Sequence, residues 1–217
     1  MIIEIGHYAL VLSLATALIV STVPAIGAWR RDSAMMGLAP VASLTMFVLV
    51  LIAFGALTWA YVVSDFSLRN VWENSHSLMP VVYKVSGVWG NHEGSMLLWL
   101  LILTFFSALV ALFGRNLPDT LRANVLAVQA WISTAFMLSI LLTSNPFLRL
   151  NQAPAEGQDL NPVLQDPGLA IHPPLLYLGY VGFFVCFSFA VAASWMAAST
   201  PPGRAGCGPG RSPPGPS

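Results

Sequence analysis

Charged side chains are scarce in this sequence of 217 residues. Asp, Glu, Lys and Arg make up 8% of it, whereas a soluble domain carries roughly 25%. So few charges could not cover the surface of a water-soluble protein of this length. Nine basic and nine acidic side chains also cancel, which leaves no net field to attract a nucleic acid. We therefore expect a lipid bilayer, and no nucleic acid, around this chain.

Several motifs with well-defined chemistry are missing too. The sequence contains no Walker A or dinucleotide-type glycine motif and no HExxH zinc motif. It has no CxxCH pattern, so it is not itself a c-type cytochrome. Its two cysteines, Cys186 and Cys207, lie in unrelated surroundings and predict no disulfide framework. No basic segment precedes the first apolar run, so we expect a retained helix and not a cleaved signal peptide.

What the sequence does contain is long apolar runs, which account for its 56% of hydrophobic residues. A membrane-spanning helix needs about 20 such residues. Five runs reach this length, and together they predict an all-α, polytopic membrane helix bundle over residues 1–195. Their ranges are 6–29, 41–63, 95–113, 122–143 and 171–195. Pro24 lies inside the first run and predicts a kink there.

Basic residues indicate the orientation of the bundle. They are densest in the two short loops and sparse in the two long ones, 64–94 and 144–170. Because short loops rich in Lys and Arg stay in the cytoplasm, we predict that the N-terminus and both long loops lie outside it. The short loops carry or adjoin Arg30, Arg31, Arg115 and Arg122, and the long loops carry Arg69, Lys84 and Arg149.

The last segment, 199–217, differs abruptly from the rest. Pro and Gly make up 11 of its 19 residues, a content that prevents helix formation and the burial of a core. We predict a disordered tail. Two explanations stay open: a natural tail, or an out-of-frame reading of a GC-rich gene, which we favour because such readings are rich in Pro, Gly, Arg and Ala.

Two segments hold the residues that could carry chemistry. The first, residues 87–99, reads GVWGNHEGSMLLW and places His92 and Glu93 together at the start of the third apolar run. Ionisable residues at a membrane surface are candidates for function. In the alternative interpretation, Trp89 and Trp99 anchor the helix at the interface, and Glu93 complements the positive end of the helix dipole.

The second segment, residues 157–182, reads GQDLNPVLQDPGLAIHPPLLYLGYVG. A residue before proline disfavours the helical conformation, so we expect His172 at the very start of the fifth helix, with Pro173 and Pro174 in its first turn. The helix N-terminus disfavours imidazolium, and a neutral imidazole is the form that ligates haem iron. The alternative is that His172 is only a loop or capping residue.

With these motifs, residues 1–193 strongly resemble the N-terminal part of the cytochrome c maturation protein F (CcmF/CycK) family. The segments that carry the resemblance are MIIEIGHYAL, GVWGNHEGSMLLW and LNPVLQDPGLAIHPPLLYLGYVG. The resemblance implies a component of a cytochrome c haem lyase in the bacterial inner membrane, with its long loops in the periplasm. It implies that haem arrives from a membrane-anchored haem chaperone and that, with other haem lyase subunits, the protein attaches it to apocytochrome c.

The resemblance also assigns site residues. His172 matches the first external histidine, which implies a metal ligand that holds a transient b-type haem from one axial side. Trp89, His92 and Glu93 match the family pattern and are further candidates for cofactor binding. The family's tryptophan-rich segment, its second external histidine and its intramembrane histidines have no counterpart in these 217 residues. We therefore expect poor haem affinity and no lyase activity from this chain alone.

Two other functions remain as alternatives. A transporter or proton-conducting subunit is favoured by the His92–Glu93 pair and the Pro24 kink. It is disfavoured because no apolar run carries a charge near its centre. A structural fragment without function of its own is the other alternative.

Overall fold

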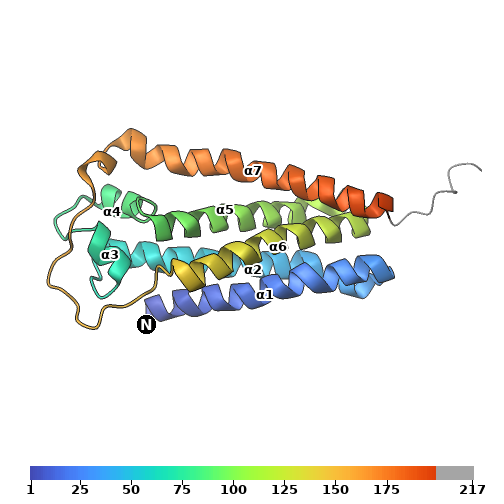
Figure 1. Cartoon of the computed structure of the whole chain (residues 1–217), viewed down its shortest axis with the longest axis horizontal. Coiled ribbons are helices and arrows are strands. Elements are labelled where there is room, and N and C mark those ends of the chain that lie inside the picture. Colours follow the sequence, from blue (N-terminus) through green and yellow to red (C-terminus); the bar gives the residue numbers. More distant parts are fainter. Residues whose placement is uncertain (199–217) are drawn as a thin grey trace, which may run out of the picture.

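The computed structural model describes residues 1–198, which fold into a bundle of helices with no strand among them (Figure 1). The predicted tail lies outside the described residues. The five long helices are α1 (Ile2–Arg30), α2 (Ser33–Val62), α5 (His92–Phe113), α6 (Asp119–Thr143) and α7 (Pro167–Ala198). Four short ones are α3 (Arg69–Asn74), α4 (Val81–Gly87) and the 3-10 turns η1 (Gly114–Asn116) and η2 (Pro162–Leu164).

All five long helices have the length and apolar composition needed to cross a membrane, which confirms the predicted helix bundle. The long connections and the N-terminus share one end of the bundle, here called the loop end (Figure 1). All five long helices begin several residues earlier than the apolar runs, and in α2 and α5 a polar side chain caps the earlier start. Asp32 caps α2 by accepting from the Ala34 amide at 2.9 Å, and Asn91 caps α5 by accepting from the Gly94 amide at 2.8 Å.

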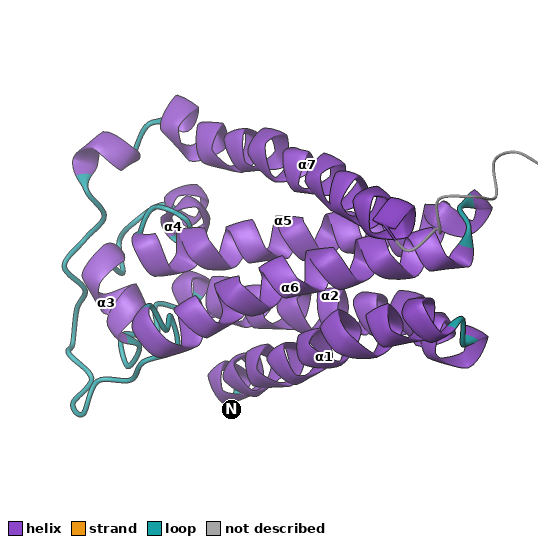
Figure 2. Ribbon diagram, turned by 45° about the vertical axis from the view of Figure 1, so that its right-hand side comes forward, coloured by secondary structure: helices purple, strands orange, loops and turns teal. Residues whose placement is uncertain are grey.

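The buried core lies among α1, α2, α5 and α6. Leu10, Met46, Leu97 and Met137, one from each of these helices, are fully buried in a single cluster. Helix α7 packs outside this group, against α5 and α6 (Figure 2). Val181 is its main contribution to a buried cluster, and most of its large apolar side chains are exposed, as expected of a helix that faces lipid.

Helix α1 continues through Pro24. A proline inside a helix removes one amide donor and displaces the carbonyl groups of the preceding turn. The Ser21 carbonyl in that turn accepts a hydrogen bond from the Trp131 indole N–H of α6 at 2.8 Å. The acceptor that loses its donor at Pro24 is the carbonyl of Val20, four residues earlier, and the indole of a neighbouring helix thus bonds to the carbonyl next to it.

The two long connections pack on each other at the loop end. Leu68 and Arg149 form an isolated antiparallel bridge, and the Gln158 amide donates to the Trp72 carbonyl at 2.8 Å. Gly157 lies so close to this contact that a Cβ there would stand 2.0 Å from the Ser75 carbonyl oxygen. Helices α3 and α4, which the sequence did not predict, therefore belong to a folded cap and not to loose loops.

Candidate functional site

The two segments that carry the chemistry meet at the loop end. The Trp89 indole N–H donates to the Ala170 carbonyl at 2.9 Å. One turn further into the bundle, the hydroxyl groups of Ser95 and Tyr177 are 2.6 Å apart, and the rings of Trp99 and Tyr177 stack with centroids 5.4 Å apart. Residues 87–99 and 157–182 therefore form a single site between α5 and α7.

Helix α7 begins earlier than the sequence predicted. It starts at Pro167, so His172, Pro173 and Pro174 lie inside the helix and not at its first position. Because Pro174 has no amide hydrogen, it cannot donate to the carbonyl four residues before it, that of Ala170. The Trp89 indole takes the place of this missing donor. The proline pair thus leaves the Ala170 carbonyl without its donor within the helix. The hydrogen bond from Trp89 to this carbonyl joins α7 to the segment between α4 and α5.

His172 is exposed on the loop-end part of α7. Its imidazole forms no hydrogen bond with any residue that the structure describes, so a ring nitrogen is free to bind a ligand. Residues 1–198 contain no group of three or more His, Cys, Asp or Glu able to hold a bare metal ion. Haem iron, however, receives four ligands from the porphyrin and needs only axial ones from protein. A single imidazole fits one axial position.

His92 and Glu93 have different surroundings although they are adjacent. His92 is exposed, whereas Glu93 is partly buried beside α3. The Asn70 amide group approaches Glu93 at 3.4 Å and donates to the Asn91 side-chain oxygen at 2.8 Å. Glu93 also lines a small cavity of about 60 Å³ together with Arg69 and other polar residues. It therefore belongs to a polar network under the cap, while His92 faces outward.

Tyr61 is buried beneath these residues and forms hydrogen bonds that hold Asn70 and Asn91 in place. The Tyr61 hydroxyl donates to the Asn70 side-chain oxygen at 2.7 Å and accepts from the Asn91 amide group at 2.9 Å. Gly94 is required below it, because a Cβ there would stand 1.6 Å from the Val88 carbonyl oxygen. Asn91 has a sequence signal, since asparagine directly before an apolar run is a typical N-cap. Tyr61 and Asn70 have none, because their partners come from other segments.

Fold and site together define a multi-pass helical membrane protein that presents an exposed imidazole beside clustered aromatic side chains. The profile of the family described as Cytochrome C assembly protein matches residues 89–205. The chain belongs to this cytochrome c assembly family.

Individual relatives agree. The cytochrome c-type biogenesis protein CycK of Rhizobium meliloti (strain 1021) is 74% identical over 193 residues, which cover 89% of this chain and 29% of that protein. CcmF of Pseudomonas aeruginosa is 54% identical, over 89% of this chain and 30% of that protein. A solved structure described as Cytochrome c Heme Lyase CcmF superposes with a TM-score of 0.78 at 28% identity, covering 91% of this chain and 31% of that one.

These findings confirm the resemblance to the N-terminal part of the CcmF family. They place the chain in a family of cytochrome c biogenesis proteins, and its described part has five helices able to span a membrane. The chain spans about 30% of the length of the relatives it matches. The haem site, the lyase activity and the individual partners are therefore subjects of proposal.

Proposed function

We propose that this chain is the haem-receiving N-terminal part of a cytochrome c haem lyase, and that His172 supplies one axial ligand to the haem. One observation carries the proposal. The hydrogen bond from Trp89 to the Ala170 carbonyl fixes the loop-end part of α7 against α5, two residues before an imidazole that is exposed and unbonded. A ligand that is held in position but open on one face suits a cofactor that arrives and leaves.

The proposed arrangement uses aromatic side chains as well as the ligand. Trp89 is partly buried and packs in the cluster between α5 and α7, with Trp99 and Tyr177 stacked behind it. Such a group gives the loop end of α7 a rigid apolar base on which the flat porphyrin could rest. Glu93 acts from further away, by holding α3 and α5 together through Asn70. His92 is exposed, and we assign it no contact with the iron.

We further propose that the chain lies in a bacterial inner membrane with its loop end in the periplasm. The basic residues of the short loops support this orientation. In that orientation the exposed His172 faces the compartment of apocytochrome c. The proposed partners are a membrane-anchored haem chaperone, the other haem lyase subunits and apocytochrome c. With His172 as its one assigned haem ligand, the 217-residue chain should bind haem weakly and should not act as a lyase alone.

The first prediction tests His172 in a chain of full family length. Residues 1–193 would be joined to the remaining sequence of the Rhizobium meliloti relative, and cytochrome c maturation measured by haem staining in a strain lacking its own protein. His172→Ala should reduce maturation at least about tenfold, because one axial nitrogen donor to the iron is lost. Added imidazole should restore part of the activity.

His76→Ala is the matched control, since it removes an imidazole at the same end of the molecule that contacts Glu156 and not Trp89. It should mature cytochrome c within about twofold of the parent. Both variants must accumulate in the membrane equally. Normal maturation by His172→Ala would show that His172 is a structural residue of α7 and that the ligand assignment is wrong.

A further inference from the structure

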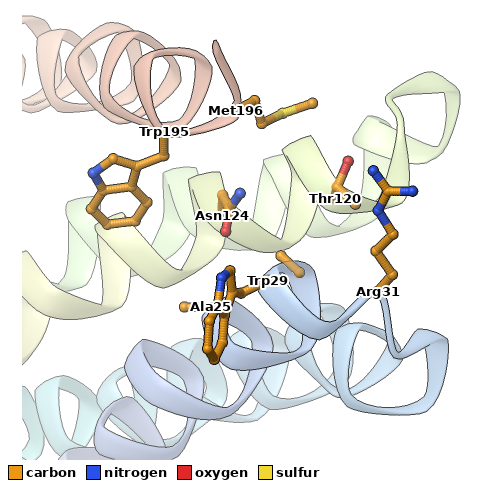
Figure 3. A pocket seen from close by; sticks show the side chains of 8 residues that line it. Ala25, Trp29, Arg31, Thr120, Asn124, Trp195 and Met196 are labelled. Atoms are coloured by element: carbon orange, nitrogen blue, oxygen red, sulfur yellow. The ribbon is translucent and has the colours of Figure 1, made fainter. Parts of the chain in front are cut away.

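A second cavity lies at the end of the bundle opposite the loop end. It has a volume of about 360 Å³, is open on one side, and is lined by residues of α1, α6 and α7 and by Arg31. Figure 3 shows its main side chains: Trp29 and Trp195 face the space from opposite sides, Asn124 lies between them, and Arg31 and Thr120 stand at one edge. The cavity takes no part in the His172 site, which lies at the other end of α7.

Asn124 indicates that the cavity binds a polar ligand. It is only 8% exposed, and its side chain is directed into the cavity (Figure 3). Its amide forms no hydrogen bond with any residue in the described part of the chain. Because the polar atoms of this otherwise buried side chain open into the cavity, their hydrogen bonds must go to water, an ion or a ligand there.

The other polar groups at the cavity favour an anion. Helix α6 begins at Asp119 without a side-chain cap, so the first-turn amides give the positive end of a helix dipole next to Thr120. The Asp119 carboxylate stands in the same turn but does not line the cavity. Arg31 forms no ion pair among residues 1–198 and reaches along the cavity towards Thr120 (Figure 3). The adjacent carboxylate of Asp32 is occupied, because it caps α2.

The two indoles indicate where the ligand comes from. Trp29 is 79% exposed and Trp195 46% exposed, and both stand at the end of membrane-spanning helices. Tryptophan at this level lies among lipid headgroups and contacts the glycerol region of the lipid. The Asn124 amide between the two rings, with the Arg31 guanidinium, the Thr120 hydroxyl and a helix N-terminus at the edge of the cavity, could hold a phosphate attached to an apolar body.

We propose that this cavity binds the phosphate of an anionic phospholipid headgroup from the leaflet at the short-loop end. Arg31 supplies the charge-assisted hydrogen bonds, Asn124 and Thr120 supply neutral ones, and the indoles pack along the lipid. Free phosphate offers the same oxygen atoms to the same donors, so an experiment has to separate the two sources.

The test is lipid binding by the purified 217-residue protein in detergent, followed by native mass spectrometry. Phosphatidylglycerol, phosphatidylcholine and inorganic phosphate are titrated separately. We expect phosphatidylglycerol to bind more tightly than phosphatidylcholine, and Arg31→Gln and Asn124→Leu each to weaken it about tenfold, the effect of losing one strong hydrogen bond. Arg30→Gln is the matched control, because it removes a neighbouring charge that does not line the cavity. It should bind within about twofold of the parent.

Circular dichroism shows whether each variant is folded. If Asn124→Leu does not fold, Arg31→Gln alone decides the test. If inorganic phosphate binds in a manner that depends on Arg31, and the two lipids bind equally, the cavity is an anion site but a phospholipid is not its ligand. This result would contradict the proposal. Equal loss of phosphatidylglycerol in Arg30→Gln and Arg31→Gln, or no loss in either, would overturn the proposal.

Discussion

At the scale of single residues, indole N–H groups complete the backbone next to prolines. Trp131 donates to the Ser21 carbonyl in the turn before Pro24, and Trp89 donates to the Ala170 carbonyl that Pro174 leaves without a donor. The Ala170 carbonyl is buried, so leaving it without a donor would be unfavourable. These tryptophans therefore act in helix packing, in addition to any role as interface anchors.

Trp89→Phe should destabilise the protein by about 1–3 kcal/mol, because it keeps an aromatic ring and leaves the Ala170 carbonyl buried and unpaired. The measurement is thermal unfolding in detergent, followed by circular dichroism. Trp99→Phe is the control, since the Trp99 indole N–H has no hydrogen-bond partner to lose among the described residues. Equal destabilisation by the two substitutions would contradict the role given to the hydrogen bond.

Gly94→Ala should destabilise the protein by more than about 3 kcal/mol, or prevent its accumulation. Its Cβ would stand 1.6 Å from the Val88 carbonyl oxygen, which is backbone and cannot move aside without unwinding the start of α5. Gly55→Ala is the matched control, because no atom beyond its own turn of helix lies within 4 Å of its added Cβ. Unfolding temperatures of the two variants decide the matter, and a stable Gly94→Ala protein would show that the α5 cap is not as tightly packed as described.

At the scale of elements, the two long connections form one cap over the loop end. Besides the Leu68–Arg149 bridge, they are joined by Ser77, whose hydroxyl donates to Glu156 at 2.8 Å. Lys84 is buried below and donates to the Ser64 hydroxyl at 2.7 Å. The cap holds α3 and α4 over α5, and it thereby fixes Asn70 and Asn91 relative to each other.

The Ser77–Glu156 contact should weaken in acid. Hydrogen bonds from Ser77 hold the pKa of Glu156 below its usual range, with a smaller contribution from the charge of His76. A lowered pKa in the folded state means that the stabilisation is complete above the unfolded-state pKa and is lost as the pH falls through the folded-state value. Hydrogen exchange of the Gln158 amide, corrected for intrinsic rates, should therefore accelerate below the usual pKa of glutamate.

Glu156→Gln should remove this acceleration, because it abolishes the titration and retains an oxygen that can accept from Ser77. His76→Gln removes the imidazole and keeps the Glu156 carboxylate, so it shows which of the two groups controls the opening. The acid-induced opening should remain in this variant. An unchanged pH dependence in Glu156→Gln would show that another group controls the cap.

At the scale of the whole molecule, α7 is the least buried of the long helices. Four helices share the main core, whereas α7 is held along one side by α5 and α6 (Figure 2). Its two ends adjoin the two candidate sites, His172 at the loop end and the Trp195 side of the phosphate cavity at the other. The orientation of the bundle decides which compartment each site faces.

Single cysteines should establish this orientation. In a chain with Cys186 and Cys207 replaced by serine, Gln158→Cys should react with an impermeant thiol reagent in spheroplasts, and Ser33→Cys should react only after permeabilisation. Both positions are exposed, so accessibility within the fold does not bias the result. Ser75 lies in the same loop region but is fully buried and would not report. The reverse labelling pattern would place His172 in the cytoplasm and contradict the proposed function.

Sequence alone determined the number of spanning helices and their approximate ranges. The physical reason is that a run of about 20 apolar residues must cross a bilayer, and inside it only a helix satisfies its own backbone. Sequence also identified residues 87–99 and 157–182 and the family they belong to. The starts of α2 and α5 were missed by several residues, because capping by Asp32 and Asn91 extends a helix beyond its apolar part.

Only the tertiary structure decided how these segments combine. The position of His172 inside α7 was predicted wrongly, since local preference before proline was outweighed by a helix start at Pro167 and by the Trp89 hydrogen bond. The Tyr61–Asn70–Asn91 network and the Asn124 cavity depend on partners that are far apart in the chain. Periodicity and composition report which residues avoid water, but they carry no information about which buried polar groups will face one another.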